Sequence, residues 1–145
     1  MYDMITKNSK GVLHMKRIGL LALACCVMLS LAACTEVTGL SGNQTGTVHY
    51  AYGTITFTED LTQAEIDSLV AMLNGKVEVS VAPDCGYSQG ISFTLGSQTY
   101  AVSQDGCGVL LHMNTDRYIT LSAAEWATVQ NLFTSREGIL PCVSP

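Results

Sequence analysis

Apolar and polar residues alternate through the middle of the chain in the manner of a half-buried β-strand. The apolar positions run from Val48 to Tyr52 and then change parity, continuing at Ile55 and Phe57. Gly53 stands at the change of parity, and a glycine there is typical of a bulge or a tight turn. The pattern therefore predicts either one bent strand or two strands between residues 48 and 58.

Further strands are predicted by apolar alternation between turn residues. Five such strands lie at residues 77–81, 91–95, 98–102, 109–113 and 117–121. The first of them is bounded by Pro83, and a hairpin is expected around Gly96-Ser97. The register that this hairpin sets joins three residue pairs: Leu95 with Gln98, Phe93 with Tyr100, and Ile91 with Val102.

Two helices are predicted by their start signals. Thr62 is followed three residues later by Glu65, and Ser122 is followed in the same way by Glu125, so each pair fits a capping box. Gly75 offers a stop for the first helix. The apolar faces of the two helices comprise Ile66, Leu69, Val70 and Leu73 in the first, and Trp126, Val129 and Phe133 in the second.

The order of these elements indicates an α+β domain over residues 47–145. We expect a small antiparallel sheet of about five to seven strands with both capped helices on one face. The approximate order along the chain is β-β-α-β-β-β-β-β-α.

A leader precedes the domain. Lys16 and Arg17 are followed by residues 18–33, which are uncharged and largely apolar, too few for the roughly 20 residues of a membrane-spanning helix. A positive start, a short apolar run and small residues at its end are typical of a secretory signal, here residues 15–33. Residues 1–14 fit an upstream extension or a mis-assigned start, with Met15 as the initiator.

The end of the leader, Leu31-Ala32-Ala33-Cys34, resembles the lipobox of bacterial lipoproteins. The resemblance implies cleavage between Ala33 and Cys34, a diacylglyceryl group on the Cys34 thiol, and acyl chains such as palmitate. It also implies an extracytoplasmic position on the cell membrane or the outer membrane. Two alternatives are an ordinary secreted protein whose signal ends near a cysteine and an uncleaved membrane helix.

Removal of the leader changes the charge. The whole chain has a formal net charge of −5, but residues 34–145 hold three cations and eleven anions, which gives −8. Such a domain is repelled by nucleic acid, so no nucleic-acid partner is expected. Residues 35–46 are rich in Thr, Gly, Ser and Asn, and together with the lipidated Cys34 they predict a flexible tether over 34–46.

Three cysteines remain beyond the lipobox. The hairpin register brings Cys85 and Cys107 within one residue of a direct pair, so a disulfide between them is expected in an oxidising compartment. The alternative is a bond from Cys142 to either of the other two.

The sequence contains few candidates for chemistry. Residues 86–90 match G-x-S-x-G around Ser88, but the following residues predict a strand, whereas a nucleophile elbow requires a helix. His49 and His112 lie on strands opposite the main apolar positions and are expected to be partly exposed. No cysteine or histidine spacing predicts a metal site, and no cofactor motif is present.

These patterns favour a lipid-anchored extracytoplasmic protein that serves as a non-catalytic binding or structural module at the cell envelope. Its expected partners are the membrane, through Cys34, and an unidentified envelope protein or ligand. The alternative is a small envelope hydrolase or thiol enzyme that uses Ser88 or Cys142 with His49 or His112.

Overall fold

The computed structural model describes residues 34–136 of the chain, apart from the side chains of Cys34 and Gln89. The chain divides into two compact units between Ala33 and Cys34, and all the described residues belong to the second unit. The predicted extension (1–14) and signal (15–33) lie outside the described residues, as does Cys142. No helix within residues 34–136 has the length and apolar character needed to cross a bilayer.

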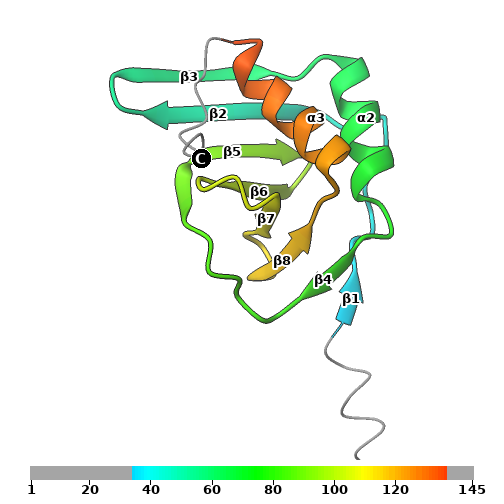
Figure 1. Ribbon diagram of the computed structural model, residues 1–145. Helices are drawn as coiled ribbons and strands as arrows, with labels where there is room; N and C mark the ends of the chain where they lie inside the picture. The colour runs from blue at the N-terminus through cyan, green and yellow to red at the C-terminus, as the bar shows by residue number, and fades with distance from the viewer. Residues whose placement is uncertain (1–33, 137–145) are drawn as a thin grey trace, which may run out of the picture. The chain divides into compact units, whose positions relative to one another are not determined.

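The described residues form one antiparallel sheet of eight strands (Figure 1). The strands are β1 (Cys34–Glu36), β2 (Gly46–Tyr52), β3 (Ile55–Asp60), β4 (Val77–Val79), β5 (Tyr87–Leu95), β6 (Gln98–Ser103), β7 (Val109–His112) and β8 (Arg117–Thr120). Their order across the sheet is β1-β4-β8-β7-β6-β5-β2-β3, so β1 and β3 are the two edges. The class, an α+β domain built on an antiparallel sheet, agrees with the sequence-based prediction.

Two helices lie on the same side of this sheet (Figure 1). Helix α2 (Gln63–Leu73) begins after Thr62 and helix α3 (Ala123–Thr134) begins after Ser122, and both have a complete capping box. The helix starts were predictable because a capping box satisfies free backbone N–H groups with residues only three positions apart.

The core lies between the helices and the sheet. Its largest fully buried side chains come from both layers and include Tyr50, Phe93, Tyr100, Leu69 and Phe133. The Tyr50 ring stacks on Phe57 of the edge strand β3, with 5.2 Å between the ring centroids. This packing extends the core to one end of the sheet.

The hairpins agree with the sequence in part. The segment around Gly53 is two strands, because Tyr52 pairs with Ile55 across a turn in which Gly53 has a φ of 61°. In the β5–β6 hairpin the pairs Leu95–Gln98 and Phe93–Tyr100 are confirmed. The register then shifts between Tyr87 and Ser92, so the predicted pair Ile91–Val102 falls in the shifted stretch.

The strand count and the order differ from the prediction because of residues 34–46. These residues were expected to be a flexible tether, whereas β1 pairs with β4 and brings the count to eight. Val37 and Leu40 are 2% and 7% exposed, and the Val37 N–H donates to the Lys76 carbonyl at 2.8 Å. Two apolar side chains and an open edge on β4 thus outweigh the polar composition of this segment.

Candidate functional site

Strand β4 places a carboxylate, rather than its valines, inside the protein. Glu78 is 3% exposed, while Val77 and Val79 on either side of it are 49% and 36% exposed. An ionised carboxylate in this position requires hydrogen-bond partners to offset the loss of water. Its partners define the candidate site.

Glu78 is bonded through both oxygens. The His112 Nδ1–H on β7 donates to Oε1, and the hydroxyls of Thr35 and Thr115 donate to Oε2 at 3.3 and 3.4 Å. His112 is 6% exposed, so its predicted partial exposure was wrong. The reason is that β4, β7 and β8 bring the carboxylate and the imidazole to the same face of the sheet.

One face of the His112 imidazole ring is covered by the ring of Tyr100. The two rings are stacked with 4.7 Å between their centroids. The Tyr100 hydroxyl donates to Gln98 Oε1 at 2.6 Å. Burial, with a smaller contribution from the negative charge of Glu78, raises the pKa of Tyr100 above its usual range. The phenol therefore remains a neutral hydrogen-bond donor at physiological pH.

A hollow of about 410 Å³ adjoins this cluster. Its lining comes from β1, β4, β6, β7 and β8 and from the segments that follow β1 and β7, and it includes Glu78, His112, Thr115 and Gln98. The Nε2 atom of His112 is buried and has no hydrogen-bond partner among residues 34–136. Because Nδ1 is held by the carboxylate, Nε2 is the one polar atom of the ring that Glu78 does not satisfy.

In the described part of the chain, no hydroxyl or thiol is hydrogen-bonded to the imidazole of His112. A nucleophilic mechanism needs a hydroxyl or thiol within hydrogen-bond reach of the base. Within residues 34–136, the threonine hydroxyls of the cluster bond to Glu78, and none bonds to His112 Nε2. The dyad therefore holds an oriented imidazole without a paired nucleophile.

The other predicted catalytic candidates do not meet here. Ser88 lies on β5, where its Oγ accepts a hydrogen bond from the Gly90 N–H at 3.1 Å. The strand after Ser88 rules out a nucleophile elbow, as the sequence predicted. His49 lies on β2, is partly exposed as expected, and shares a 2.8 Å hydrogen bond with Thr58 on β3. In the described part of the chain no hydrogen bond joins Ser88 to either histidine.

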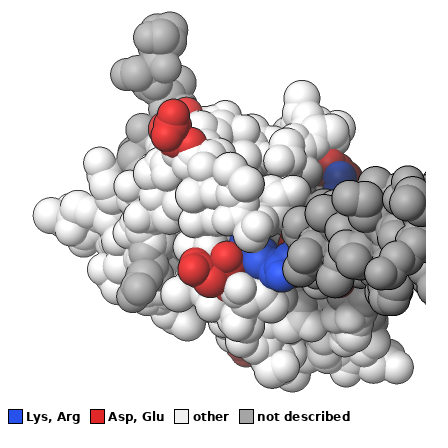
Figure 2. All heavy atoms as spheres, turned by 90° about the horizontal axis from the view of Figure 1, so that it is seen from below, with Lys and Arg blue, Asp and Glu red and all other residues white. Residues whose placement is uncertain are grey.

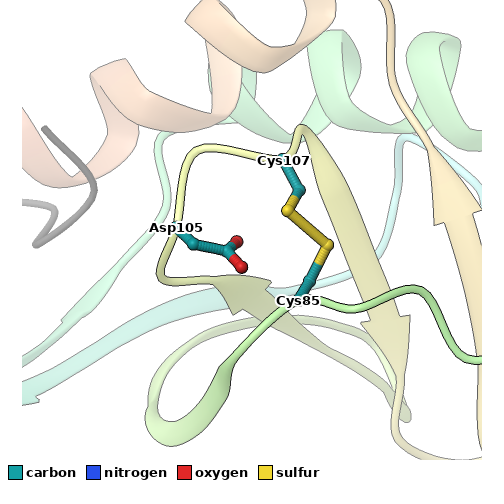
Figure 3. Close-up of side chains that lie close together, drawn as sticks. All are labelled: Cys85, Asp105 and Cys107. Carbon is teal, nitrogen blue, oxygen red and sulfur yellow. A yellow bond between two sulfur atoms is a disulfide. The ribbon is translucent and has the colours of Figure 1, made fainter. Parts of the chain in front are cut away.

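The expected disulfide between Cys85 and Cys107 is present, with 6.4 Å between the two Cα atoms (Figure 3). It links the loop before β5 to the loop before β7. The Asp105 carboxylate lies beside it and accepts a hydrogen bond from the Gly86 N–H at 3.1 Å.

These three side chains also bring their ligand atoms within 4.8 Å of one another, a spacing compatible with a metal ion. Both sulfurs are consumed by the disulfide, however, and a metal requires thiolates. In the oxidised protein this cluster is therefore a structural disulfide, and the Asp105 carboxylate beside it is bonded to the Gly86 N–H.

Cys34, the residue expected to be lipidated, is the first residue of β1. Its Cα is paired with that of Val79 on β4. Ala33, on the other side of the expected cleavage, lies outside the described residues. The backbone of Cys34 therefore belongs to the edge of the sheet and is not separated from it by a linker.

Sequence reasoning missed Glu78, although a signal for it exists. A lone acidic residue between two valines in a short strand has two possible orientations, and the usual one turns the valines inward. The reverse orientation becomes visible only when the sheet is assembled and β7, two strands away from β4, brings His112 to the same face as Glu78. Thr115, in the β7–β8 turn, gave no signal of its own.

Comparison of the chain with protein-family models, with curated proteins and with solved structures finds no match.

Proposed function

We propose that the mature protein is a lipid-anchored, extracytoplasmic module that binds or organises other components of the bacterial cell envelope and has no catalytic activity. The observation that carries this proposal is the coincidence of two boundaries. The lipobox-like Leu31-Ala32-Ala33-Cys34 predicts cleavage before Cys34, and the folded unit begins at the same residue. Cleavage there leaves the folded unit intact, with the anchor residue at its start.

The disulfide supports the proposed location. Disulfides persist in oxidising compartments and are rare in the reducing cytosol. The Cys85–Cys107 bond is therefore consistent with a domain that is exported before it folds.

The hollow beside Glu78 and His112 supports binding as the activity. Its lining consists mainly of polar and charged side chains, the imidazole of His112 among them. The alternative, an envelope hydrolase or thiol enzyme using Ser88 or Cys142, lacks support from the described residues, because the Ser88 hydroxyl is bonded to a backbone N–H two residues away.

The anchor is tested by metabolic labelling with an alkyne-bearing fatty acid in a bacterial host. We expect the wild-type chain to be labelled and Cys34→Ala to be unlabelled. Cys26→Ala, which removes a leader cysteine and leaves the lipobox intact, is the matched control and should be labelled like the wild type. Mass spectrometry that finds residues 1–33 attached, or an unmodified thiol at Cys34, would contradict the proposal.

The absence of catalysis is tested with activity-based probes on the same preparation. A fluorophosphonate labels activated serines, and an iodoacetamide probe labels reactive thiols. Fluorophosphonate labelling that disappears in Ser88→Ala would favour the hydrolase instead. Rapid iodoacetamide labelling that is lost in Cys142→Ala would favour the thiol enzyme.

A further inference from the structure

Strand β4 and the segment after it turn an apolar stripe toward solvent. The stripe consists of Val77 and Val79 on β4 and of Val81, two residues beyond the end of the strand, and these side chains are 49%, 36% and 77% exposed. On β4 the stripe follows from the burial of Glu78, because successive side chains on a strand point to opposite faces. We call these three residues the valine stripe.

The stripe continues across neighbouring strands on the same face of the sheet. Val79 pairs with Tyr118 on β8, and Tyr118 pairs with Leu111 on β7. Both of these side chains are partly exposed. The Tyr87 ring packs against Tyr118 with 5.7 Å between the centroids. Tyrosine is enriched at membrane–water interfaces, where its ring sits at the level of the headgroups.

The stripe lies directly beside the proposed anchor. Val79 is the Cα partner of Cys34, and Val77 is the partner of Glu36. Neighbouring strands are about 5 Å apart, so lipid chains on Cys34 would enter the bilayer next to the stripe. With Val37 held in the core, no flexible linker allows the domain to move away from that position.

The charge around this edge is low. Figure 2 looks onto the lower end of the molecule in Figure 1, the end that carries β1 and β4, and the described surface there is mainly uncharged with scattered acidic and basic groups. The formal charge of −8 on residues 34–145 disfavours anionic headgroups. With the exposed Glu36 as the acidic side chain of β1, the valines of β4 are the part of this edge best suited to a zwitterionic lipid surface.

We propose that the valine stripe rests on the lipid bilayer and fixes the orientation of the domain at the membrane. This inference rests on the proposed lipidation of Cys34. In this orientation the edge strand β1 and its neighbour β4 face the lipid, and the opposite edge strand β3 is the farthest from it. The acyl chains on Cys34 and the valine stripe then form two adjoining contacts with one membrane.

The orientation is tested by tryptophan quenching in the full, lipidated protein. The protein is reconstituted in phosphatidylcholine vesicles with ordinary or brominated acyl chains, and the signal of the native Trp126 is subtracted using the parent protein. The reporter is Val79→Trp. The matched control is Ile55→Trp on β3, where the native side chain is 37% exposed, close to the 36% of Val79.

We expect the brominated chains to lower the fluorescence of the Val79→Trp reporter roughly twofold and to leave the Ile55→Trp reporter unchanged. Equal quenching of the two reporters, or no quenching of either, would overturn the proposed orientation. If Val79→Trp fails to fold, Val77→Trp serves as the reporter, because that side chain is more exposed.

Vesicle flotation separates the two proposals. If the wild type floats with the vesicles and Cys34→Ala does not, the lipid anchor is supported. If the Val79→Trp reporter is unquenched in the same vesicles, the proposed contact of the valine stripe with the bilayer is refuted. Equal flotation of the two proteins would refute the lipid anchor itself.

Discussion

Glu78 and His112 show how a single acidic residue is accommodated in the interior. Transfer of a carboxylate from water into a protein is costly unless its oxygens are hydrogen-bonded. Here His112 satisfies one oxygen, and Thr35 and Thr115 satisfy the other. Since these partners come from β1, β7 and the β7–β8 turn, one carboxylate ties together three separate segments.

Removal of Glu78 should therefore be strongly destabilising. We expect Glu78→Ala to lower the free energy of unfolding by about 3 kcal/mol, because it leaves a buried imidazole N–H without its partner. Urea denaturation measures the loss. Glu78→Gln, which preserves the shape and one acceptor, should cost less. Exposed ion pairs contribute up to about 1 kcal/mol to the free energy of unfolding. A smaller loss than this in Glu78→Ala would show that the buried Glu78–His112 pair stabilises the protein no more than an exposed pair does.

At the scale of secondary-structure elements, both helices begin with the same motif, a capping box. In α3 the Ser122 hydroxyl accepts from the Glu125 N–H, and the Glu125 carboxylate accepts from the Ser122 N–H at 2.7 Å. In α2 the residues Thr62 and Glu65 are related in the same way. Because each cap satisfies orphan N–H groups that helix formation leaves behind, it defines the first residue of its helix.

Ser122→Ala tests the contribution of the cap. The expected loss in the free energy of unfolding is about 1 kcal/mol, since the Glu125 N–H loses its acceptor. Thermal unfolding followed by circular dichroism measures it. The control is Ser135→Ala at the other end of α3, which removes a hydroxyl but no N-cap and should change stability by less than about 0.5 kcal/mol. Equal losses in the two variants would refute the assignment.

The disulfide constrains two loops of the sheet. It joins residues 22 positions apart, Cys85 and Cys107, so Cys85→Ser with Cys107→Ser should lower the stability by about 3 kcal/mol through the added freedom of the unfolded chain. Urea denaturation of the wild type with and without reductant should give the same difference. Peptide mapping that finds Cys85 joined to Cys142 would contradict the pairing.

How far the sequence predicts these elements depends on how local their determinants are. Both helix starts and the Leu95–Gln98 hairpin depend on residues a few positions apart, and all three are correct. Strand β1 was missed because its partner lies 43 residues away at the Thr35–Glu78 pair. The orientation of β4 was unpredictable for the same reason, since the environment of Glu78 is created by His112 from a distant strand.

At the scale of the whole molecule, its scarce cations link elements together. Arg136, just after α3, binds Glu65 in α2 at 2.8 and 2.9 Å and Glu59 in β3 at 3.1 Å. Lys76, just before β4, binds Glu125 in α3 at 2.8 Å. An acidic domain therefore uses two of its three cations to hold its helices to each other and to the sheet.

These links make stability depend on pH in the acid range. The hydrogen bond from Arg136 lowers the pKa of Glu65 from its ordinary value of 4.5 to about 2, and Lys76 lowers that of Glu125 to about 2. Because both folded-state values lie below the unfolded value, the contribution is complete above pH 4.5 and is lost as the pH falls toward 2. After solvent screening we expect about 1 kcal/mol from each group.

Denaturation midpoints in urea at pH 6 and pH 3 measure this dependence. Arg136→Met should reduce the difference between the two midpoints, since Glu65 then titrates near its ordinary value. Arg136→Lys, which retains the charge, should keep most of the difference. A pH dependence identical in the wild type and in Arg136→Met would show that this ion pair is not the cause.

The sheet order also determines which part of the domain opens most easily. Strand β1 meets β4 through three residue pairs, and β4 meets β8 through the single pair Val79–Tyr118. The few backbone pairs at this end favour its opening before that of the meander from β5 to β8, although this opening also breaks the Glu78–His112 bond. Amide hydrogen exchange should be faster at residues 34–36 and 77–79 than at residues 98–102. The margin of the molecule nearest the proposed anchor thus has the fewest backbone pairs to the rest of the sheet.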